Sequence, residues 1–295
     1  MAAMTPGTWG RYGTDDERGA ANLLSPACVQ RALSCAATGR VYSLALPLAD
    51  GGGPLAAHRA PMRHYMTRAG SDYAAGLPER GALGFADDVI TVATHGTTHL
   101  DALAHVWQDG VMYNGFPATE VTSIGARRCG IDKTGPIVTR ALIVDLVPDG
   151  RPWLEPGEAV GVGRLVELVE SLGVAPEPGD ALLLRTGWIE HWRSGTLPDV
   201  GSWPGLHPDC GTWIADREFA LVGADNMAVE VGPSPLPGEA APMHVELIRG
   251  HGIYLMELVD LAELVTSGAG TGLLMVNPLR IERGAGSPVA PVVVV

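Results

Sequence analysis

Short apolar runs separated by glycine, proline and polar residues recur along the chain, which is the pattern of buried strands. The predicted strands cover residues 41–48, 89–93, 141–147, 181–184, 219–222, 253–258, 273–276 and 289–295. Helices are predicted between several of them, over residues 26–37, 160–172, 207–216 and 244–249. Because strands and helices are mixed without one strict βαβ rhythm, the pattern predicts an α/β fold built on a mixed sheet.

The first predicted helix, over residues 26–37, has a clear start signal. Ser25 is a good N-cap residue, and Pro26 suits the first helical turn because its missing N–H has no helical partner anyway. No shift in composition marks a domain boundary elsewhere in the sequence. We therefore expect a single domain over residues 1–295 that includes an N-terminal arm of roughly residues 1–40.

Composition and charge narrow the classes of protein that fit this sequence. Hydrophobic residues make up 46% of the 295 residues, and charged residues make up only 18%. The usual charged share is about 25%, so the composition excludes a disordered chain. The formal net charge of −13 repels phosphate backbones and anionic lipid. We therefore expect no nucleic-acid partner and no membrane partner.

The sequence also lacks the usual signals of membrane insertion, secretion and disulfide bonding. No apolar run reaches the ~18–20 residues that span a bilayer, and the first residues do not resemble a signal peptide. The four cysteines form no C-x-x-C pair, which fits neither a disulfide scaffold nor a zinc finger. We expect reduced thiols and a cytoplasmic location.

Three histidines and one aspartate are concentrated in an eleven-residue segment. His95, His99, Asp101 and His105 stand at positions i, i+4, i+6 and i+10. Imidazole and carboxylate groups without a thiolate suit Zn²⁺ or Mn²⁺, and an open coordination position would make such a site catalytic. The alternative is that these are ordinary polar residues in a loop.

A metal site requires these four side chains to converge, and no single regular element achieves this. On a straight strand, His95 and His99 would lie about 13 Å apart. On a straight helix, the first two and the last two ligands would point to opposite sides. The segment Gly96–Thr98 is a poor helix former. We therefore predict a strand that ends near Thr94, a bend, and a short helix from about Asp101.

The segment resembles the signature of the cyclase family, H-x-G-T-H-x-D-x-P-x-H. This family of metal-dependent hydrolases includes bacterial kynurenine formamidase and isatin hydrolase. The matching positions are His95, Thr98, His99, Asp101 and His105. Thr97 stands where the family usually has Gly, and Leu103 stands where its short members have Pro. The resemblance covers nearly the whole chain, and it is to the longer members of the family. Further matching blocks lie within residues 9–24, 109–115, 179–188, 223–230 and 278–288.

The resemblance implies the swivelling β/β/α fold of this family and a homo-oligomer, commonly a dimer or tetramer. It also implies a second group of metal ligands late in the chain, His244 at the start of a helix and Glu257 on the following strand. Asp101 would bridge if two ions bind. Taken without the family, His244 could instead cap a helix and Glu257 could be a surface residue. His251 and Glu246 are nearby competitors for the ligand role.

The activity that the resemblance implies is hydrolysis of an amide, a cyclic amide or a lactone of a small-molecule substrate by metal-activated water. In this interpretation His105 stays off the metal and transfers a proton between water and the leaving group. One alternative is a metal-assisted cyclase or lyase that acts on a carbonyl compound without net addition of water. Another is a catalytically inactive protein that binds a small ligand or a metal, and a third is a structural protein stabilised by a metal.

Several other polar and aromatic residues are weaker candidates for substrate contact. Arg185 and Trp188 could line the pocket, although Trp188 also fits core packing. His64 lies in a segment that could cover the site or form a plain surface loop. Asp225 and Asn226 could support a metal-ligating histidine, or they could make a turn.

Overall fold

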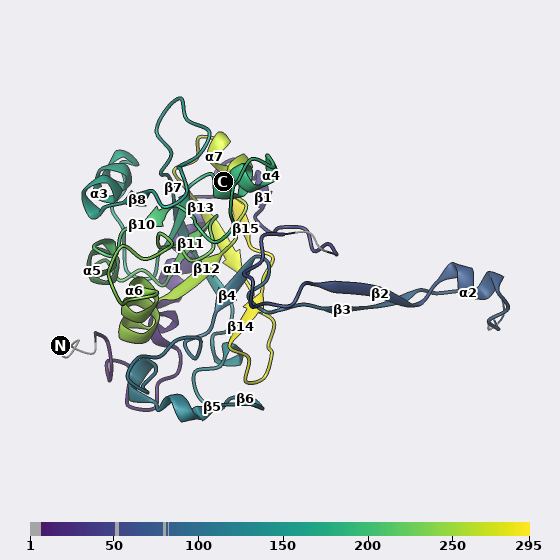
Figure 1. The fold of residues 1–295 in the computed structure, drawn as a ribbon. Helices are drawn as coiled ribbons and strands as arrows, with labels where there is room; N and C mark the ends of the chain where they lie inside the picture. The colour runs from purple at the N-terminus through teal and green to yellow at the C-terminus, as the bar shows by residue number, and fades with distance from the viewer. Residues whose placement is uncertain (1–6, 51–52, 79–80, 82) are drawn as a thin grey trace.

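A nine-stranded mixed sheet forms the centre of the computed structural model, which describes residues 7–50, 53–78, 81 and 83–295 (Figure 1). The strand order is β1-β15-β13-β7-β9-β11-β12-β4-β14. Four neighbouring strands are parallel: β7 (Ile137–Asp145), β9 (Ala181–Arg185), β11 (Leu221–Ala224) and β12 (Tyr254–Glu257). The remaining strands pair antiparallel: β1 (Val41–Ser43), β15 (Val292–Val294), β13 (Thr271–Val276), β4 (His99–Asp101) and β14 (Gly286–Pro288).

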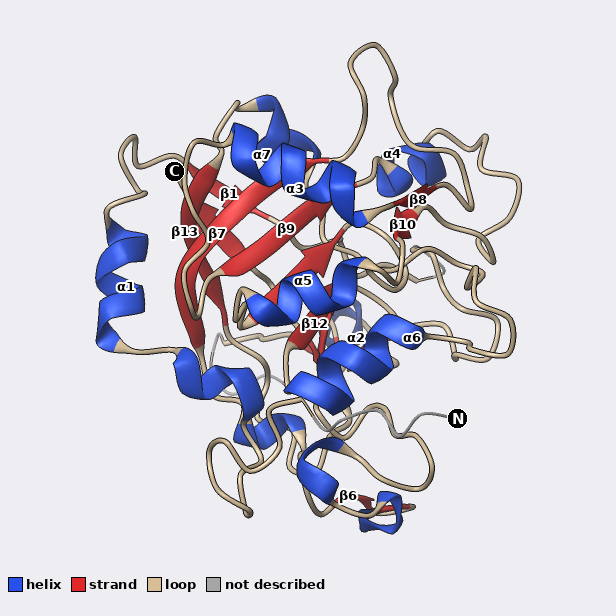
Figure 2. Ribbon diagram, turned by 90° about the vertical axis from the view of Figure 1, so that its left-hand side faces the viewer, coloured by secondary structure: helices blue, strands red, loops and turns tan. Residues whose placement is uncertain are grey.

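Helices cover the sheet, and three short strand pairs lie outside it. Figure 2 shows α3 and α5 in front of the sheet. The α-helices are α1 (Pro26–Leu33), α2 (Gly70–Ala74), α3 (Val162–Ser171), α4 (Trp188–Arg193), α5 (Cys210–Asp216), α6 (Pro242–His244) and α7 (Ala262–Thr266). A π-helical segment, η5 (Val245–His251), continues α6, and 3-10 turns span η1 (Gly19–Leu23), η2 (Tyr113–Gly115), η3 (Ala118–Glu120) and η4 (Ile131–Lys133). The outlying strand pairs are β2 (Arg63–Arg68) with β3 (Asp87–Thr91), β5 (Val121–Thr122) with β6 (Gly125–Ala126), and β8 (Ala159–Val160) with β10 (Gly205–Leu206).

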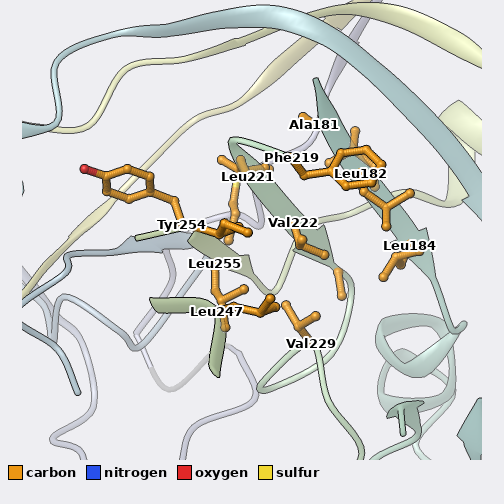
Figure 3. Close-up of a cluster of buried hydrophobic side chains, with 14 of the residues drawn as sticks. Ala181, Leu182, Leu184, Phe219, Leu221, Val222, Val229, Leu247, Tyr254 and Leu255 are labelled. Atoms are coloured by element: carbon orange, nitrogen blue, oxygen red, sulfur yellow. The ribbon is translucent and has the colours of Figure 1, made fainter. Parts of the chain in front are cut away.

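The central parallel strands build the hydrophobic core because both of their faces are covered. Leu182, Val222 and Leu255 are fully buried on three successive strands, and Figure 3 shows them packed together. Continuous apolar runs are typical of parallel strands buried on both faces. These runs are the ones that predicted strands in the sequence, and the predicted α/β fold with a mixed sheet is confirmed.

Several predicted boundaries are wrong by a few residues. The first helix is capped by Ser25 as predicted, but it ends at Leu33. The strand predicted over residues 41–48 covers only three residues. The helix predicted over residues 244–249 continues to His251 in π-helical geometry and ends at Gly252, whose φ of 67° suits glycine. The division into one domain with an N-terminal arm stays a prediction.

The predicted bend in the histidine-rich segment is present, but the elements on either side differ from the prediction. The helix expected from Asp101 is wrong, because residues 99–101 form β4 between β12 and β14. The strand expected to end near Thr94 ends at Thr91. Among the residues that the structure describes, that strand, β3, pairs only with β2, in a hairpin that projects from the body of the molecule (Figure 1). The hairpin was not predicted, because β2 contains charged residues and lacks a regular apolar alternation.

The part of the chain that the structure describes contains no helix long and apolar enough to cross a membrane. The expected cytoplasmic location stays a prediction.

A buried ion-pair cluster joins α1 to the sheet and provides a test of the fold. The fully buried Asp180 accepts hydrogen bonds from Arg140 of β7 at 2.6 Å and from Arg31 of α1 at 2.9 Å. Replacing Asp180 with Ala leaves two cations without their counter-charge, so we expect the free energy of unfolding to fall by about 3–5 kcal/mol. Glu177→Ala is the control, because this more exposed partner should contribute only about 0–1 kcal/mol. Urea denaturation of both variants measures the difference, and equal effects would contradict the assignment.

Candidate metal centre

Adjacent strands β4 and β12 supply three side chains of the candidate centre. His99 and Asp101 are two residues apart on β4, so their side chains point to the same face of the sheet. Glu257 is the residue on β12 that pairs with His99. The Nε2 atom of His99 lies 3.3 Å from Glu257 Oε2 and 3.4 Å from Asp101 Oδ1.

The bend before β4 brings His95 to the same place. Its Nδ1 atom lies 2.7 Å from Asp101 Oδ1, although the two residues are six positions apart. The ring packs against β14, where Gly286 pairs with Asp101. A Cβ atom at position 286 would lie 2.5 Å from His95 Cε1, so only glycine leaves room for this imidazole.

His244 reaches the cluster from the opposite side, at the end of α6. Its Nε2 atom lies 3.1 Å from Glu257 Oε1 and 3.7 Å from Asp101 Oδ2. The structure thus brings together all five residues that the sequence proposed as ligands. Glu246 was one of the two alternative candidates for the late metal ligands. It accepts a hydrogen bond from Thr212.

Two of the imidazoles are oriented by contacts on their outer nitrogen atoms. His99 Nδ1 donates to the carbonyl oxygen of Thr97 at 2.7 Å, which leaves Nε2 to face the cluster. His244 Nδ1 lies 2.6 Å from Glu230 Oε1. Hydrogen bonds of this kind fix the ring orientation of metal-bound histidines. The role of Glu230 was not predicted, although the residue lies in one of the matching blocks of the sequence.

The buried polar atoms at the centre lack hydrogen-bond partners among the described residues. These atoms are both ring nitrogens of His95, Nε2 of His99 and both carboxylate oxygens of Asp101. Unpaired buried polar atoms are rare because each costs about 1–3 kcal/mol. A divalent cation would satisfy them, and nitrogen and oxygen ligands from histidine and carboxylate suit such an ion.

The potential ligand atoms form two overlapping groups. One group is His99, Asp101 and Glu257, and the other is His95, Asp101 and His105; in each, the ligand atoms lie within 4.8 Å of one another. Asp101 belongs to both groups, so its carboxylate is placed to bridge two ions. The arrangement therefore fits either one or two divalent cations.

Carboxylates and imidazoles shift one another's protonation in the metal-free cluster. Burial lowers the pKa of His99, but the carboxylates of Asp101 and Glu257 beside its Nε2 atom outweigh burial and raise it to about 9. Burial opposes the charge of His244 as well, yet Glu230 and Glu257 raise its pKa well above the usual value. The surrounding imidazoles hold the pKa of Asp101 well below its usual range in spite of burial. The cluster therefore combines ionised carboxylates with protonated imidazoles, and a metal ion can replace the protons of these imidazoles.

His105 lies at the boundary between this cluster and the solvent. Its ring stacks on that of His95, with centroids 4.0 Å apart, and its Nε2 atom lies 4.0 Å from Asp101 Oδ1. The side chain is 25% exposed, whereas His99 and Asp101 are buried. Burial and the nearby His95 and His244 lower its pKa to about 4 despite the charge of Asp101. The imidazole is therefore neutral at pH 7.

A pocket of about 370 Å³ opens directly beside His105. It is lined by residues 105–108, 238–242 and 245. Trp107 is 49% exposed there, which is unusual for so large an aromatic side chain. This pocket was not predicted from the sequence. The signals available were a tryptophan two residues after the motif and a segment rich in glycine and proline before His244.

The three side chains predicted to contact substrate have other contacts in the structure. Arg185 donates to both carboxylate oxygens of Asp145 and to Glu190. Trp188 is fully buried in a second hydrophobic cluster, and His64 pairs with Asp88 on the projecting hairpin at 2.8 Å. A role for these three in substrate binding stays a prediction.

The Asp225–Asn226 pair makes turns. Asp225 accepts hydrogen bonds from the backbone and hydroxyl of Thr186 and from the backbone of Gly187, and burial raises its pKa to about 7. Asn226 bonds the carbonyl oxygens of Pro204 and Val229. We considered that Asp225 or Asn226 could support a metal-ligating histidine. In the structure, Glu230 contacts the histidine instead.

Comparison with protein-family models gives a match to the family described as "Putative cyclase" over residues 42–231, most of the chain. The chain belongs to the cyclase family. A search of curated protein sequences found no match.

Solved structures agree with this membership of the cyclase family. A crystal structure described as a novel cyclase is 32% identical, with a TM-score of 0.89, over 99% of this chain and 100% of that one. Isatin hydrolase A from Labrenzia aggregata is 19% identical, with a TM-score of 0.67, over 88% and 96%. An isatin hydrolase bound to thioisatinate, a product analogue, is 17% identical, with a TM-score of 0.65, over 92% and 99%. At these lower identities the likeness to isatin hydrolases shows the fold alone.

Removal of the Glu230 charge should weaken metal binding in this cyclase-family chain. Glu230→Gln keeps the size of the side chain but removes the carboxylate that orients His244, so we expect Zn²⁺ affinity to fall about 10–100-fold. Glu246→Gln is the matched control, because Glu246 contacts Thr212 and should leave the affinity unchanged. Titration against a competing chelator measures both. Equal affinities for the two variants would contradict the orienting role of Glu230.

Metal affinity of the cyclase-family chain should rise with pH up to about 9, because the proposed ligands His99 and His244 both have raised pKa values. The pKa of His99 is raised to about 9, so at pH 7 a metal must displace a proton from its imidazole. Below pH 9, each pH unit is expected to strengthen binding about tenfold for each displaced proton. Chelator titrations from about pH 6.5 to about pH 9.5 measure this trend. An affinity that does not change with pH would show that no proton is displaced.

Proposed function

We propose that this chain is a metal-dependent hydrolase that cleaves an amide, a cyclic amide or a lactone bond of a small molecule in the cytoplasm. The supporting observation is the set of buried, unpartnered atoms of His95, His99 and Asp101 directly beside a pocket that can admit a small molecule. A structural metal would not need such a pocket. Isatin hydrolases share this fold, and we extend their reaction class, hydrolysis, to this chain.

In this proposal the metal ligands are His95, His99, Asp101, His244 and Glu257. When bound, Zn²⁺ or Mn²⁺ supplies a Lewis acid and lowers the pKa of coordinated water to about 7. The ligand set contains nitrogen and oxygen donors and no thiolate, which suits both of these ions. Asp101 accommodates one ion or bridges two, since its carboxylate lies between His95 on one side and His99 and His244 on the other.

His105 is the proposed proton carrier of the site. Its imidazole is neutral at pH 7, so it can accept a proton from the attacking water. The same nitrogen can then donate that proton to the leaving nitrogen or oxygen of the substrate. Its place at the pocket wall puts it between the cluster and any bound molecule. His95 stacks on the ring and holds its orientation.

The pocket beside His105 holds the organic part of the substrate in this proposal. Its walls combine Val106, Trp107 and Val245 with the chain segment 238–242. A half-exposed tryptophan offers a flat apolar surface to a ring or a planar carbonyl compound. We therefore expect compact, planar substrates rather than long chains.

The proposed reaction can be tested by the mass of its product. The metal-loaded protein is incubated with a panel of aryl formamides, cyclic amides and lactones in ¹⁸O-labelled water. Hydrolysis yields a product that contains one added water with one labelled oxygen. A product without added water would contradict hydrolysis and indicate a cyclase or lyase reaction instead. Turnover of no substrate by a fully metal-loaded protein would favour a binding protein.

Replacement of His105 by Ala tests whether this residue carries a proton or binds the metal. We expect turnover to fall about 10²–10⁴-fold because the general acid–base group is lost. Metal content should stay at the wild-type value. His207→Ala is the control, since His207 pairs with Asp209 outside the site and its loss should change neither quantity. Loss of metal from His105→Ala would make His105 a ligand.

A further inference from the structure

A second cavity, with a volume of about 730 Å³, lies where the β5–β6 turn meets the loop that leads into β14. These two segments lie side by side at the lower end of the molecule in Figure 1. The cavity has about twice the volume of the pocket beside His105, and the described residues that line the two are all different. The second cavity is therefore separate from the candidate metal centre.

Positive charge is concentrated around this second cavity. Its lining contains two acidic residues and four basic ones, an excess of two positive charges; the basic residues are Arg127, Lys133, Arg280 and Arg283. They are four of the chain's twenty lysine and arginine residues, and Lys133 is its only lysine. The chain as a whole has a net charge of −13. A positively charged cavity on such a molecule favours anions, which the rest of the surface repels.

The two acidic residues of the lining are already matched by neighbouring groups. Asp132 Oδ2 lies 3.2 Å from Lys133 Nζ, and Asp132 Oδ1 accepts a hydrogen bond from the backbone N–H of Arg283 at 3.1 Å. Glu282 Oε1 lies 3.7 Å from Arg283 Nε. The excess positive charge of the lining therefore belongs to its other two cations, Arg127 and Arg280.

Arg127 and Arg280 are exposed and lack an acidic partner. Among the residues that the structure describes, none places a carboxylate oxygen within 4.0 Å of either guanidinium group. A guanidinium group presents several N–H donors in a fork that matches the oxygens of a phosphate or a carboxylate. Two such groups at one cavity therefore suit an oxyanion ligand.

The backbone fixes the two walls of the cavity relative to each other. The carbonyl oxygen of Arg283 accepts a hydrogen bond from the N–H of Ala126 at 2.9 Å. A Cβ atom at Gly125 would lie 2.6 Å from Arg283 Cβ, so only glycine permits this approach. Arg283 itself has a φ of 62°, in the left-handed region that is costly for a residue other than glycine. The walls are therefore preorganised, which lowers the entropic cost of binding a ligand between them.

Both walls are also hydrogen-bonded to the segment that carries the candidate metal ligands. Ala102 donates its N–H to the carbonyl oxygen of Ala285 at 3.0 Å, and Ala104 donates to that of Cys129 at 3.0 Å. Ala102 directly follows Asp101, and Ala104 lies three residues beyond it. A ligand that bridges the two walls would therefore also stabilise the surroundings of the metal centre.

We propose that this second cavity binds a small anion that carries two or more phosphate or carboxylate groups, with Arg127 and Arg280 as its charged contacts. The two guanidinium groups come from separate segments, and the volume exceeds what a single phosphate or carboxylate group needs. An anion with two charged groups fits this arrangement better than one with a single group. The inference is independent of the proposed hydrolysis, because the cavity is separate from the metal centre and binding involves no reaction.

Calorimetric titration of the full, metal-loaded chain at constant ionic strength tests the proposal. The probes are 1,3-propanediol bisphosphate and tricarballylate, which are weak chelators, and the tighter of the two identifies the preferred charged group. We expect the double variant Arg127→Gln/Arg280→Gln to bind the preferred probe about tenfold more weakly or worse, because it loses hydrogen bonds to charged groups. Arg40→Gln/Arg164→Gln is the matched control, since it removes the same charge from two exposed arginines outside the cavity and should leave the affinity unchanged.

Acetylation of Lys133 provides a second readout that reports on the cavity directly. Because Lys133 is the only lysine, an amine-acetylating reagent modifies one side chain, and the N-terminal amine serves as the internal reference. We expect a saturating concentration of the preferred probe to slow acetylation of Lys133 at least about threefold, because the occupied cavity shields the amine. The N-terminal amine should react at an unchanged rate. Mass spectrometry measures both rates.

Three outcomes would overturn the proposal. One is that neither probe binds. Another is that the Arg127→Gln/Arg280→Gln variant binds as tightly as wild type while Lys133 stays unprotected, which would assign the signal to the metal centre. The third is equal weakening in the Arg40→Gln/Arg164→Gln control, which would show that net charge alone attracts the anion.

Discussion

The Asp101 carboxylate is fully buried, and four histidine side chains, three from the motif and one from the end of α6, lie within 4.0 Å of its oxygens. A buried carboxylate without hydrogen-bond donors is costly unless positive charge surrounds it. The nearby strands, the bend before β4 and the end of α6 all converge on this one group. Protonated imidazoles supply the positive charge in the metal-free protein. A divalent cation bound to the carboxylate would supply it in their place. The rest of the site follows from this requirement.

The fold satisfies the requirement by placing rigid elements on each side of the carboxylate. Strand β4 is held between β12 and β14, so the side chains of His99, Asp101 and Glu257 have fixed positions in a hydrogen-bonded ladder. Glu230 accepts hydrogen bonds from the backbone of Met243 and His244 and from the His244 ring, which fixes the start of α6. The side facing His105 opens to the pocket, and we expect a substrate to enter there.

Much of this arrangement could be predicted from the sequence, for identifiable reasons. The core strands appear as apolar runs because they are parallel and covered on both faces. The cluster of His95, His99, Asp101 and His105 was found from the number and spacing of these residues in a chain poor in charge. His244 and Glu257 came only from the resemblance to the cyclase family, because they are distant in sequence from the cluster. Strand β4 was missed because its three residues include two polar ligands, so it shows no apolar alternation. The orienting role of Glu230 depends on a contact across fourteen residues, and the pocket depends on segments that meet only in the folded chain.

The central claim is that a divalent cation completes the cluster around Asp101, and elemental analysis tests it most directly. The untagged protein is compared with Asp101→Asn, which keeps the shape of the side chain and removes its charge. The account predicts one or two equivalents of zinc or manganese per wild-type chain and a loss of that metal in the folded variant. A wild-type protein that binds no metal after reconstitution, with its fold intact, would contradict the account.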